Sequence, residues 1–155
     1  MSETLTKSPS INNYIYVPSI NLYVAKEKSH LELNWYDTHK QLYQEGLLMP
    51  TIPQFIEYIN YLKKNPDGIK DASKQEIEKI LDDILIVRDP WRAEWLDAKF
   101  ERKDKLCINY NHRTESNGNL APKNSETLEK CLMKNKISGI DLDSLLINHT
   151  LQGLP

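Results

Sequence analysis

An acidic and basic pair in the second half of the chain has residue types that could do chemistry. Asp97 and Lys99 are separated by a single residue, and Asp89 precedes them. In many nucleases an acid-x-Lys pair on a strand binds magnesium and activates water, because carboxylates hold the hard cation and the lysine stabilises negative charge. Here the spacing is short, and no glutamate from a preceding helix completes the set. We therefore favour the interpretation that Asp97 and Lys99 lie on an ordinary solvent-exposed strand. The alternative function is a small metal-dependent nuclease of a mobile element that uses Asp89, Asp97 and Lys99.

The four histidines form no recognisable metal-binding pattern. His30, His39, His112 and His149 share no spacing typical of zinc ligands. His39 follows Trp35 by one helical turn, and we expect it at the edge of a core. The chain also has no glycine-rich phosphate loop and no nucleophile elbow. The sequence therefore predicts no catalytic residue, no metal ligand and no cofactor, and we expect the protein not to be an enzyme.

Two segments rich in aromatic and polar side chains could instead bind a ligand. The first, at 90–95, contains two tryptophans and an arginine, which are residue types enriched where proteins bind one another. The second, at 109–113, combines asparagine, tyrosine, histidine and arginine at the end of an expected strand. Each has a structural alternative, because the indoles could anchor a hairpin to helices and the polar cluster could fix a loop. The candidate binding residues are Trp91, Arg92, Asn109, Asn111, His112 and Arg113.

Three amphipathic helices are expected to position these residues. The first begins at Asn34 and ends near Gly46. The second begins at Thr51 and the third at Ser73, each with Gln or Glu three residues later, which is the pattern of a capping box. Apolar residues recur at helical spacing in all three. We expect one sheet to cover their apolar faces and to bury Trp35, Leu48, Phe55, Ile59, Ile80 and Ile84.

Strands are expected on both sides of these helices. Tyr14 to Ala25 is aromatic and β-branched and predicts a strand, with Pro18 interrupting it at an edge or a bulge. A β-hairpin is predicted over 96–110, with the charged run at 102–105 as its turn.

The region after this hairpin carries weaker signals. Residues 111–122 are polar, and we expect them to be irregular. A short helix capped by Asn124 or Ser125 should follow, and Asp141 can cap a final helical turn.

Composition limits the classes of function. The chain has 20 basic and 22 acidic residues, so no overall field directs it to nucleic acid. It has no apolar run near the roughly 18 residues that span a bilayer and no secretory signal, so we expect cytoplasmic synthesis without membrane insertion. We expect Cys107 and Cys131 to be reduced thiols, with a disulfide between them as the alternative. Residues 1–13 should form a flexible arm, and 14–155 a single α+β domain.

One stretch resembles a known family. A tryptophan-containing helix ends near a glycine, a Leu-x-Pro-Thr segment follows, and an aromatic-bearing helix begins. This order resembles the first two helices of the formylglycine-generating-enzyme type of the C-type lectin fold. Here Met49 intervenes within the Leu-Pro-Thr segment, and Ile52-Pro53-Gln54 replaces the usual acidic start of the second helix. The resemblance covers about a sixth of the chain and is carried by Asn34 to Tyr43, Gly46, Leu48, Pro50, Thr51 and Phe55 to Tyr58.

The wider chain is similar to the variable proteins of diversity-generating retroelements. That likeness implies a C-type-lectin-like α+β fold with a small mixed or antiparallel sheet and two early helices. It also implies a non-catalytic scaffold that binds a protein or a cell-surface ligand. The family's diversified binding residues, and the catalytic cysteines of its enzyme branch, lie in a C-terminal part of the fold that would begin near Pro155, so no position here carries them. The segments that carry the likeness are 14–27, 91–100, 108–113 and 117–132.

The same resemblance implies a property of the N-terminal strand. In the lectin-type fold this strand pairs with a C-terminal strand, and we expect this chain to be the N-terminal portion of such a domain, either truncated or a natural short form. An unpaired β-branched edge can template another strand, so self-association, or replacement of the partner by another segment, is expected. An interaction protein of a phage or plasmid, unrelated to lectins, is a further alternative.

Overall fold

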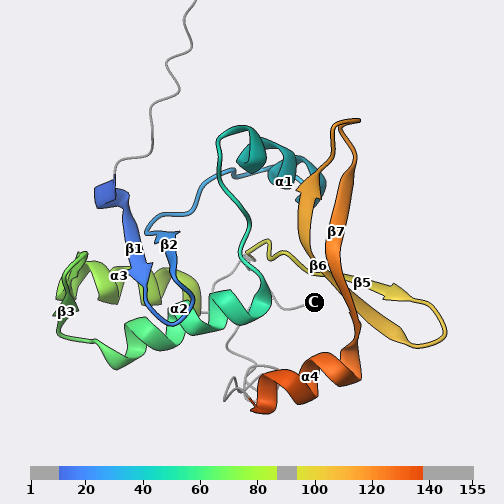
Figure 1. Ribbon diagram of the computed structural model, residues 1–155. Coiled ribbons are helices and arrows are strands. Elements are labelled where there is room, and N and C mark those ends of the chain that lie inside the picture. Colours follow the sequence, from blue (N-terminus) through green and yellow to red (C-terminus); the bar gives the residue numbers. More distant parts are fainter. Residues whose placement is uncertain (1–10, 87–93, 138–155) are drawn as a thin grey trace, which may run out of the picture.

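The computed structural model describes residues 11–86 and 94–137. In this part of the chain four α-helices and three small antiparallel sheets make a mixed α+β protein, as the sequence predicts (Figure 1). Residues 1–10 of the expected arm, Asp89, Trp91, Arg92 and the expected turn at Asp141 lie outside the described residues. After one 3-10 turn at Ile11–Asn13, the elements are β1 (Tyr14–Val17), β2 (Leu22–Ala25), α1 (Trp35–Gln44), α2 (Ile52–Lys64), β3 (Gly68–Ile69), β4 (Ala72–Ser73), α3 (Lys74–Leu85), β5 (Lys99–Arg102), β6 (Leu106–Thr114), β7 (Leu120–Thr127) and α4 (Leu128–Ile137).

The N-terminal β-structure is a hairpin and not the single interrupted strand that the sequence predicts. β1 and β2 pair antiparallel, with Tyr14 opposite Ala25 and Val17 opposite Leu22. Pro18 starts the turn, and Asn21 ends it in the left-handed conformation at φ 52°, which asparagine tolerates better than most residues. The chain therefore reverses at Pro18, and β1 finds its partner within the same segment.

A hydrophobic core cluster lies between this hairpin and two helices. Ile15 and Val17 of β1 meet Leu62 of α2 and Ile77 of α3, and all four side chains are buried. α2 begins with the predicted capping box of Thr51 and Gln54, and α3 is capped by Ser73. We call β1, β2, α2, β3, β4 and α3 the helical half of the molecule.

The first three helices form where the sequence predicts them, but four of the six expected core residues are not fully buried. Ile59 and Ile80 are buried. Trp35, Phe55 and Ile84 are only half-buried. Leu48 is 52% exposed, because it lies in the extended connection between α1 and α2, where neighbouring side chains point in opposite directions and Met49 takes the buried position.

A three-stranded antiparallel sheet forms the other half of the molecule. Its order is β5-β6-β7, and α1 and α4 pack against it; we call these five elements the sheet half. The expectation that one sheet covers the first three helices is wrong, because α2 contacts β1 and α3 contacts β3 and β4, which belong to other sheets. The predicted hairpin is confirmed as β5 and β6, although β5 begins only at Lys99. The expectation of irregular structure at 111–122 is wrong, because the ladder continues to Thr114 opposite Leu120. β7 is an edge strand, which allows Pro122 to take part without an N–H.

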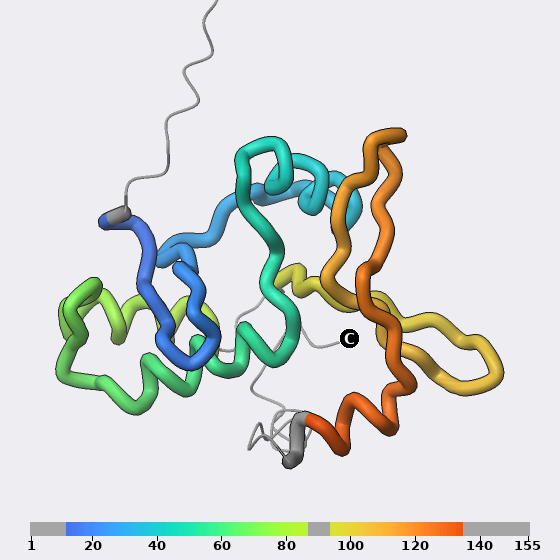
Figure 2. The backbone as a smooth tube through the Cα atoms, in the orientation of Figure 1, coloured from blue at the N-terminus to red at the C-terminus, as the bar shows by residue number. Residues whose placement is uncertain are grey.

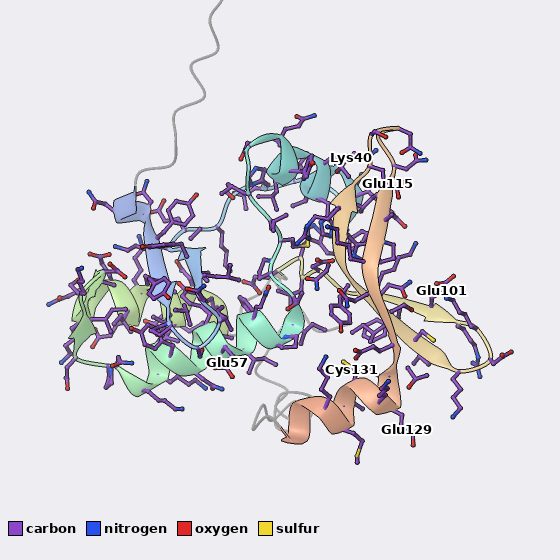
Figure 3. All side chains as sticks on the ribbon, viewed as in Figure 1. Lys40, Glu57, Glu101, Glu115, Glu129 and Cys131 are labelled. Carbon is purple, nitrogen blue, oxygen red and sulfur yellow. The ribbon has the colours of Figure 1, made fainter. Side chains whose placement is uncertain are left out.

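The last described helix packs below the sheet. Thr127 accepts a hydrogen bond from the backbone N–H of Lys130 at 3.3 Å, so it caps α4 in place of the expected Asn124 or Ser125, which belong to β7. Cys131 is buried on the side of α4 that faces the sheet, whereas Glu129 is exposed (Figure 3). Cys107 and Cys131 are not joined by a disulfide.

The two halves are joined by the extended connections on either side of α1. The connection from α1 to α2 runs between the β1–β2 hairpin and the sheet (Figure 2). Leu47 N–H donates to the Leu42 carbonyl at 2.8 Å, and Gly46 has a φ of 73° that closes α1 as predicted.

In the described parts of the chain, no helix combines the length and apolar character needed to cross a bilayer.

Candidate functional site

A buried polar cluster lies where α1 meets the sheet. Asp97 accepts hydrogen bonds from the backbone N–H of His112 at 3.1 Å and from the imidazole of the same residue, whose Nδ1 is 2.5 Å from Oδ1. Nε2 of His39 lies 3.6 Å from the same Oδ1. Asp97 is 1% exposed, and both histidines are buried. We call these three residues the His–Asp–His cluster.

Hydrogen bonds to the backbone fix the segment that carries Asp97. The N–H of Asp97 donates to the Pro50 carbonyl at 2.8 Å, which ties it to the α1–α2 connection. The indole of Trp35 donates to the Leu96 carbonyl at 2.9 Å. The indole of Trp95 donates to the Leu33 carbonyl at 3.0 Å. The segment before β5 therefore has a defined place although it has no regular secondary structure.

Aromatic packing surrounds the two histidines. Trp35 precedes His39 by one turn of α1, and their rings meet edge to face with centroids 4.4 Å apart. The same indole meets the His112 ring at 4.9 Å. Burial lowers the pKa of His39 to about 4; the nearby His112 and Arg113 act in the same direction, and Asp97 opposes them. His39 is therefore neutral at physiological pH.

A cavity of about 620 Å³ lies next to this cluster. It is formed by the β1–β2 hairpin, the β2–α1 and α1–α2 connections, parts of α1, α2 and α3, residues 94–96 and two residues of β6. Most of the lining is apolar and includes Leu33, Leu42, Leu47, Met49, Phe55 and Ile84. A volume of this size suits a small ligand or a few side chains of a partner.

The wall between cavity and cluster is built from neighbours of the cluster. Thr38 precedes His39 in α1, and Leu96 precedes Asp97, and both line the cavity. Asn111 and Arg113, on either side of His112, line it as well. The His–Asp–His cluster therefore holds these wall residues in position from the side away from the cavity.

Arg113 gives the cavity its principal unpaired positive charge. Lys26 and Lys28 also line the cavity, but they form ion pairs with Glu76 and Glu94. The Arg113 guanidinium donates to the His112 carbonyl at 2.9 Å, and within the described residues no carboxylate lies within 4.0 Å of it. Its remaining N–H donors are available to a ligand.

The structure separates the candidate binding residues into different environments. Asn111 and Arg113 lie together on the cavity wall, and His112 is buried behind it. Asn109 is also buried and donates to Glu101 at 3.0 Å, so it links β6 to β5 and does not line the cavity. Trp91 and Arg92 are outside the described residues, and their neighbour Trp95 lines the cavity and is 51% exposed.

The side chains of Asp97 and Lys99, the pair considered for magnesium binding, do not point toward a common site. Asp97 precedes β5 and faces His112 in the interior. Lys99 is exposed, and its Nζ lies 5.4 Å from the centre of the Tyr36 ring. The geometry therefore gives no support to a nuclease site shared by these two side chains, and Asp89 lies outside the described residues.

Searches of protein-family models, of curated proteins and of solved structures found no match for this chain. The function proposed below therefore rests on the site's geometry and on the resemblance described above.

Proposed function

We propose that this chain is a non-catalytic binding scaffold of the C-type-lectin-like kind found among variable proteins of diversity-generating retroelements. Its ligand is a protein or cell-surface molecule that places an apolar group and an anionic or hydrogen-bond-accepting group in the cavity. The observation that carries the proposal is that Asn111 and Arg113, two residues expected to bind a ligand, line a largely apolar cavity.

The order of elements supports the lectin-like part of the proposal. α1 carries Trp35 and ends at Gly46, an extended connection follows, and α2 carries Phe55. This is the order found in the family that the sequence resembles. The pairing of β1 with β2 departs from the family's pairing of the N-terminal strand with a C-terminal strand.

The chemistry of the cavity supports the class of ligand. Apolar ligand surface buried against the aliphatic walls contributes a favourable transfer free energy of about 25 cal/mol per Å² removed from water. A carboxylate or carbonyl of the ligand can accept from Arg113, and charge-assisted bonds of this type are the stronger ones. Asn111 already donates to Asn124 at 2.8 Å, so its carbonyl oxygen is the group available for orientation.

A fluorescent probe of the same chemistry tests the cavity directly. 1-Anilinonaphthalene-8-sulfonate combines an aromatic body with one anionic group, and its fluorescence rises in apolar surroundings. We expect saturable binding of one probe per chain. Arg113→Gln should weaken this binding about tenfold, as the loss of one charge-assisted hydrogen bond predicts. Leu47→Trp, which fills the cavity, should weaken it further.

A matched surface variant separates binding in the cavity from general stickiness. Lys103 is exposed in the β5–β6 turn, so Lys103→Gln removes a positive charge away from the cavity and should leave the affinity unchanged. Circular dichroism must show that each variant is folded. Equal affinities for wild type, Arg113→Gln and Leu47→Trp would show that the probe binds elsewhere, and the proposed binding site would then be wrong.

A further inference from the structure

Three donor atoms of the kind that bind metal ions converge inside the sheet half. They are one ring nitrogen each from His39 and His112 and a carboxylate oxygen of Asp97, and all lie within 4.8 Å of one another. Oδ1 of Asp97 lies 3.6 Å from Nε2 of His39 and 2.5 Å from Nδ1 of His112. The residues come from α1, from the segment before β5 and from β6, so 73 positions of sequence separate the first from the last. Each of them is more than nine-tenths buried.

His39 has a nitrogen that the fold leaves unsatisfied. Among the described residues, no group accepts from or donates to its Nε2, although that atom is buried. A buried polar atom without a partner costs about 1–3 kcal/mol. Neutral imidazole is the form that binds metal ions, so an ion would satisfy the orphaned atom.

We propose that His39, Asp97 and His112 bind a divalent transition-metal ion, with Zn²⁺ as the reference ion. Two imidazoles and one carboxylate favour such an ion over Mg²⁺ or Ca²⁺, which prefer all-oxygen sites. Zn²⁺ binds these donors at about 2.0–2.2 Å, which leaves donor atoms on one ion about 3–4 Å apart. Nε2 of His39 already lies 3.6 Å from Oδ1 of Asp97, which is within this range.

The bound ion replaces one hydrogen bond and keeps another. It takes the place of the hydrogen between His112 Nδ1 and Asp97 Oδ1, so these two atoms move apart from their 2.5 Å separation. The imidazole then carries its proton on Nε2, which leaves the lone pair of Nδ1 for the ion. Oδ2 of Asp97 still accepts from the backbone N–H of His112 at 3.1 Å, which orients the carboxylate. The ion ties α1 to β6 behind the cavity wall. This site does not depend on a ligand in the cavity.

The test uses metal-free protein prepared with a chelator that is then removed. We expect calorimetric titration with Zn²⁺ to show one ion per chain. Zn²⁺ should raise the melting temperature because it binds only the folded chain, whereas Mg²⁺ should not. Co²⁺ should give the visible absorption of a low-symmetry site with nitrogen and oxygen donors. His39→Leu removes one ligand without orphaning a partner and should lower Zn²⁺ affinity by on the order of 100-fold or more, beyond the loss typical of outer-sphere changes.

His30 provides the matched control. It is half-buried beside Glu45 and lies outside the cluster, so His30→Leu should bind Zn²⁺ as the wild type does. His39→Gln repeats the test if the leucine variant does not fold. The absence of stoichiometric Zn²⁺ binding by the wild type would overturn the proposal. Equal binding by wild type and the folded His39 variant would also overturn it, because the ion would then be held elsewhere, for example by the thiols.

Discussion

The carboxylate of Asp97 accepts hydrogen bonds from both the backbone and the side chain of His112, at 3.1 Å and 2.5 Å. A single residue of β6 is thereby joined twice to the segment before β5. Because Asp97 also donates its N–H to Pro50, the same residue connects the sheet with the α1–α2 connection. Asp97 is therefore the residue through which three parts of the chain are held around the cavity.

Asp97→Ala should destabilise the protein strongly. The substitution leaves two donors of His112 buried without an acceptor, and breaking a buried pair of this kind costs about 3–5 kcal/mol. Urea denaturation at neutral pH in the presence of a chelator measures the free energy of unfolding. Asp104→Ala, in the exposed β5–β6 turn, is the control and should change it by less than about 0.5 kcal/mol. A cost below about 1 kcal/mol for Asp97→Ala would contradict the role given to this residue.

Leu62→Ala should cost more stability than Phe55→Ala. Leu62 is fully buried in the core of the helical half, where truncation typically costs about 2–5 kcal/mol. Phe55 is half-buried and lines the cavity, so its ring loses fewer contacts when it is removed. Denaturant unfolding of both variants gives the comparison. If Phe55→Ala were the more damaging change, the core would be centred on the cavity wall instead.

The carboxyl group of Glu76 should titrate below its ordinary range. A hydrogen bond from Lys26 Nζ, 2.7 Å away, is the main cause of its lowered pKa. Because the folded-state pKa is depressed, the pair is present at neutral pH and is lost as the pH falls through that pKa. NMR titration of the Glu76 side chain should show a higher pKa in Lys26→Met. An unchanged pKa in that variant would mean that β2 and α3 do not meet through this pair.

The chain should self-associate through the β2 strand. Leu22 and Tyr23 are 41% and 55% exposed on this short strand, and an apolar edge can pair with a second copy. We expect light scattering to show mass rising with concentration, and Tyr23→Lys to suppress the rise. Met133→Lys, which changes an exposed apolar residue on α4, should not. A wild type that stays monomeric at every concentration would contradict this prediction.

Local signals in the sequence were sufficient to place the first three helices. The caps at Asn34, Thr51 and Ser73 each act through backbone groups only three residues away, so the sequence alone shows them. The turn at Pro18 and Asn21 was missed because the flanking residues are equally suited to one long strand, and only pairing distinguishes the two.

The candidate site was harder to predict, because its residues meet only in the folded chain. His39, Asp97 and His112 have no characteristic spacing, and nothing local indicates that α1 packs on β6. The strand after Asn111 was missed for a similar reason. Its polar residues look like a loop until β7 pairs with them, and Asn111 itself adopts a left-handed conformation at φ 56°.

The most direct test of the binding proposal is a two-dimensional ¹H–¹⁵N NMR titration of the wild type with 1-anilinonaphthalene-8-sulfonate. We expect saturable shifts at the amides of Asn111, Arg113, Leu47 and Leu96, all of which line the cavity. We expect little change at Phe100 or Met133, which are exposed apolar residues outside the cavity lining. Shifts confined to those two residues, or no saturable shift anywhere, would contradict a binding site in the cavity.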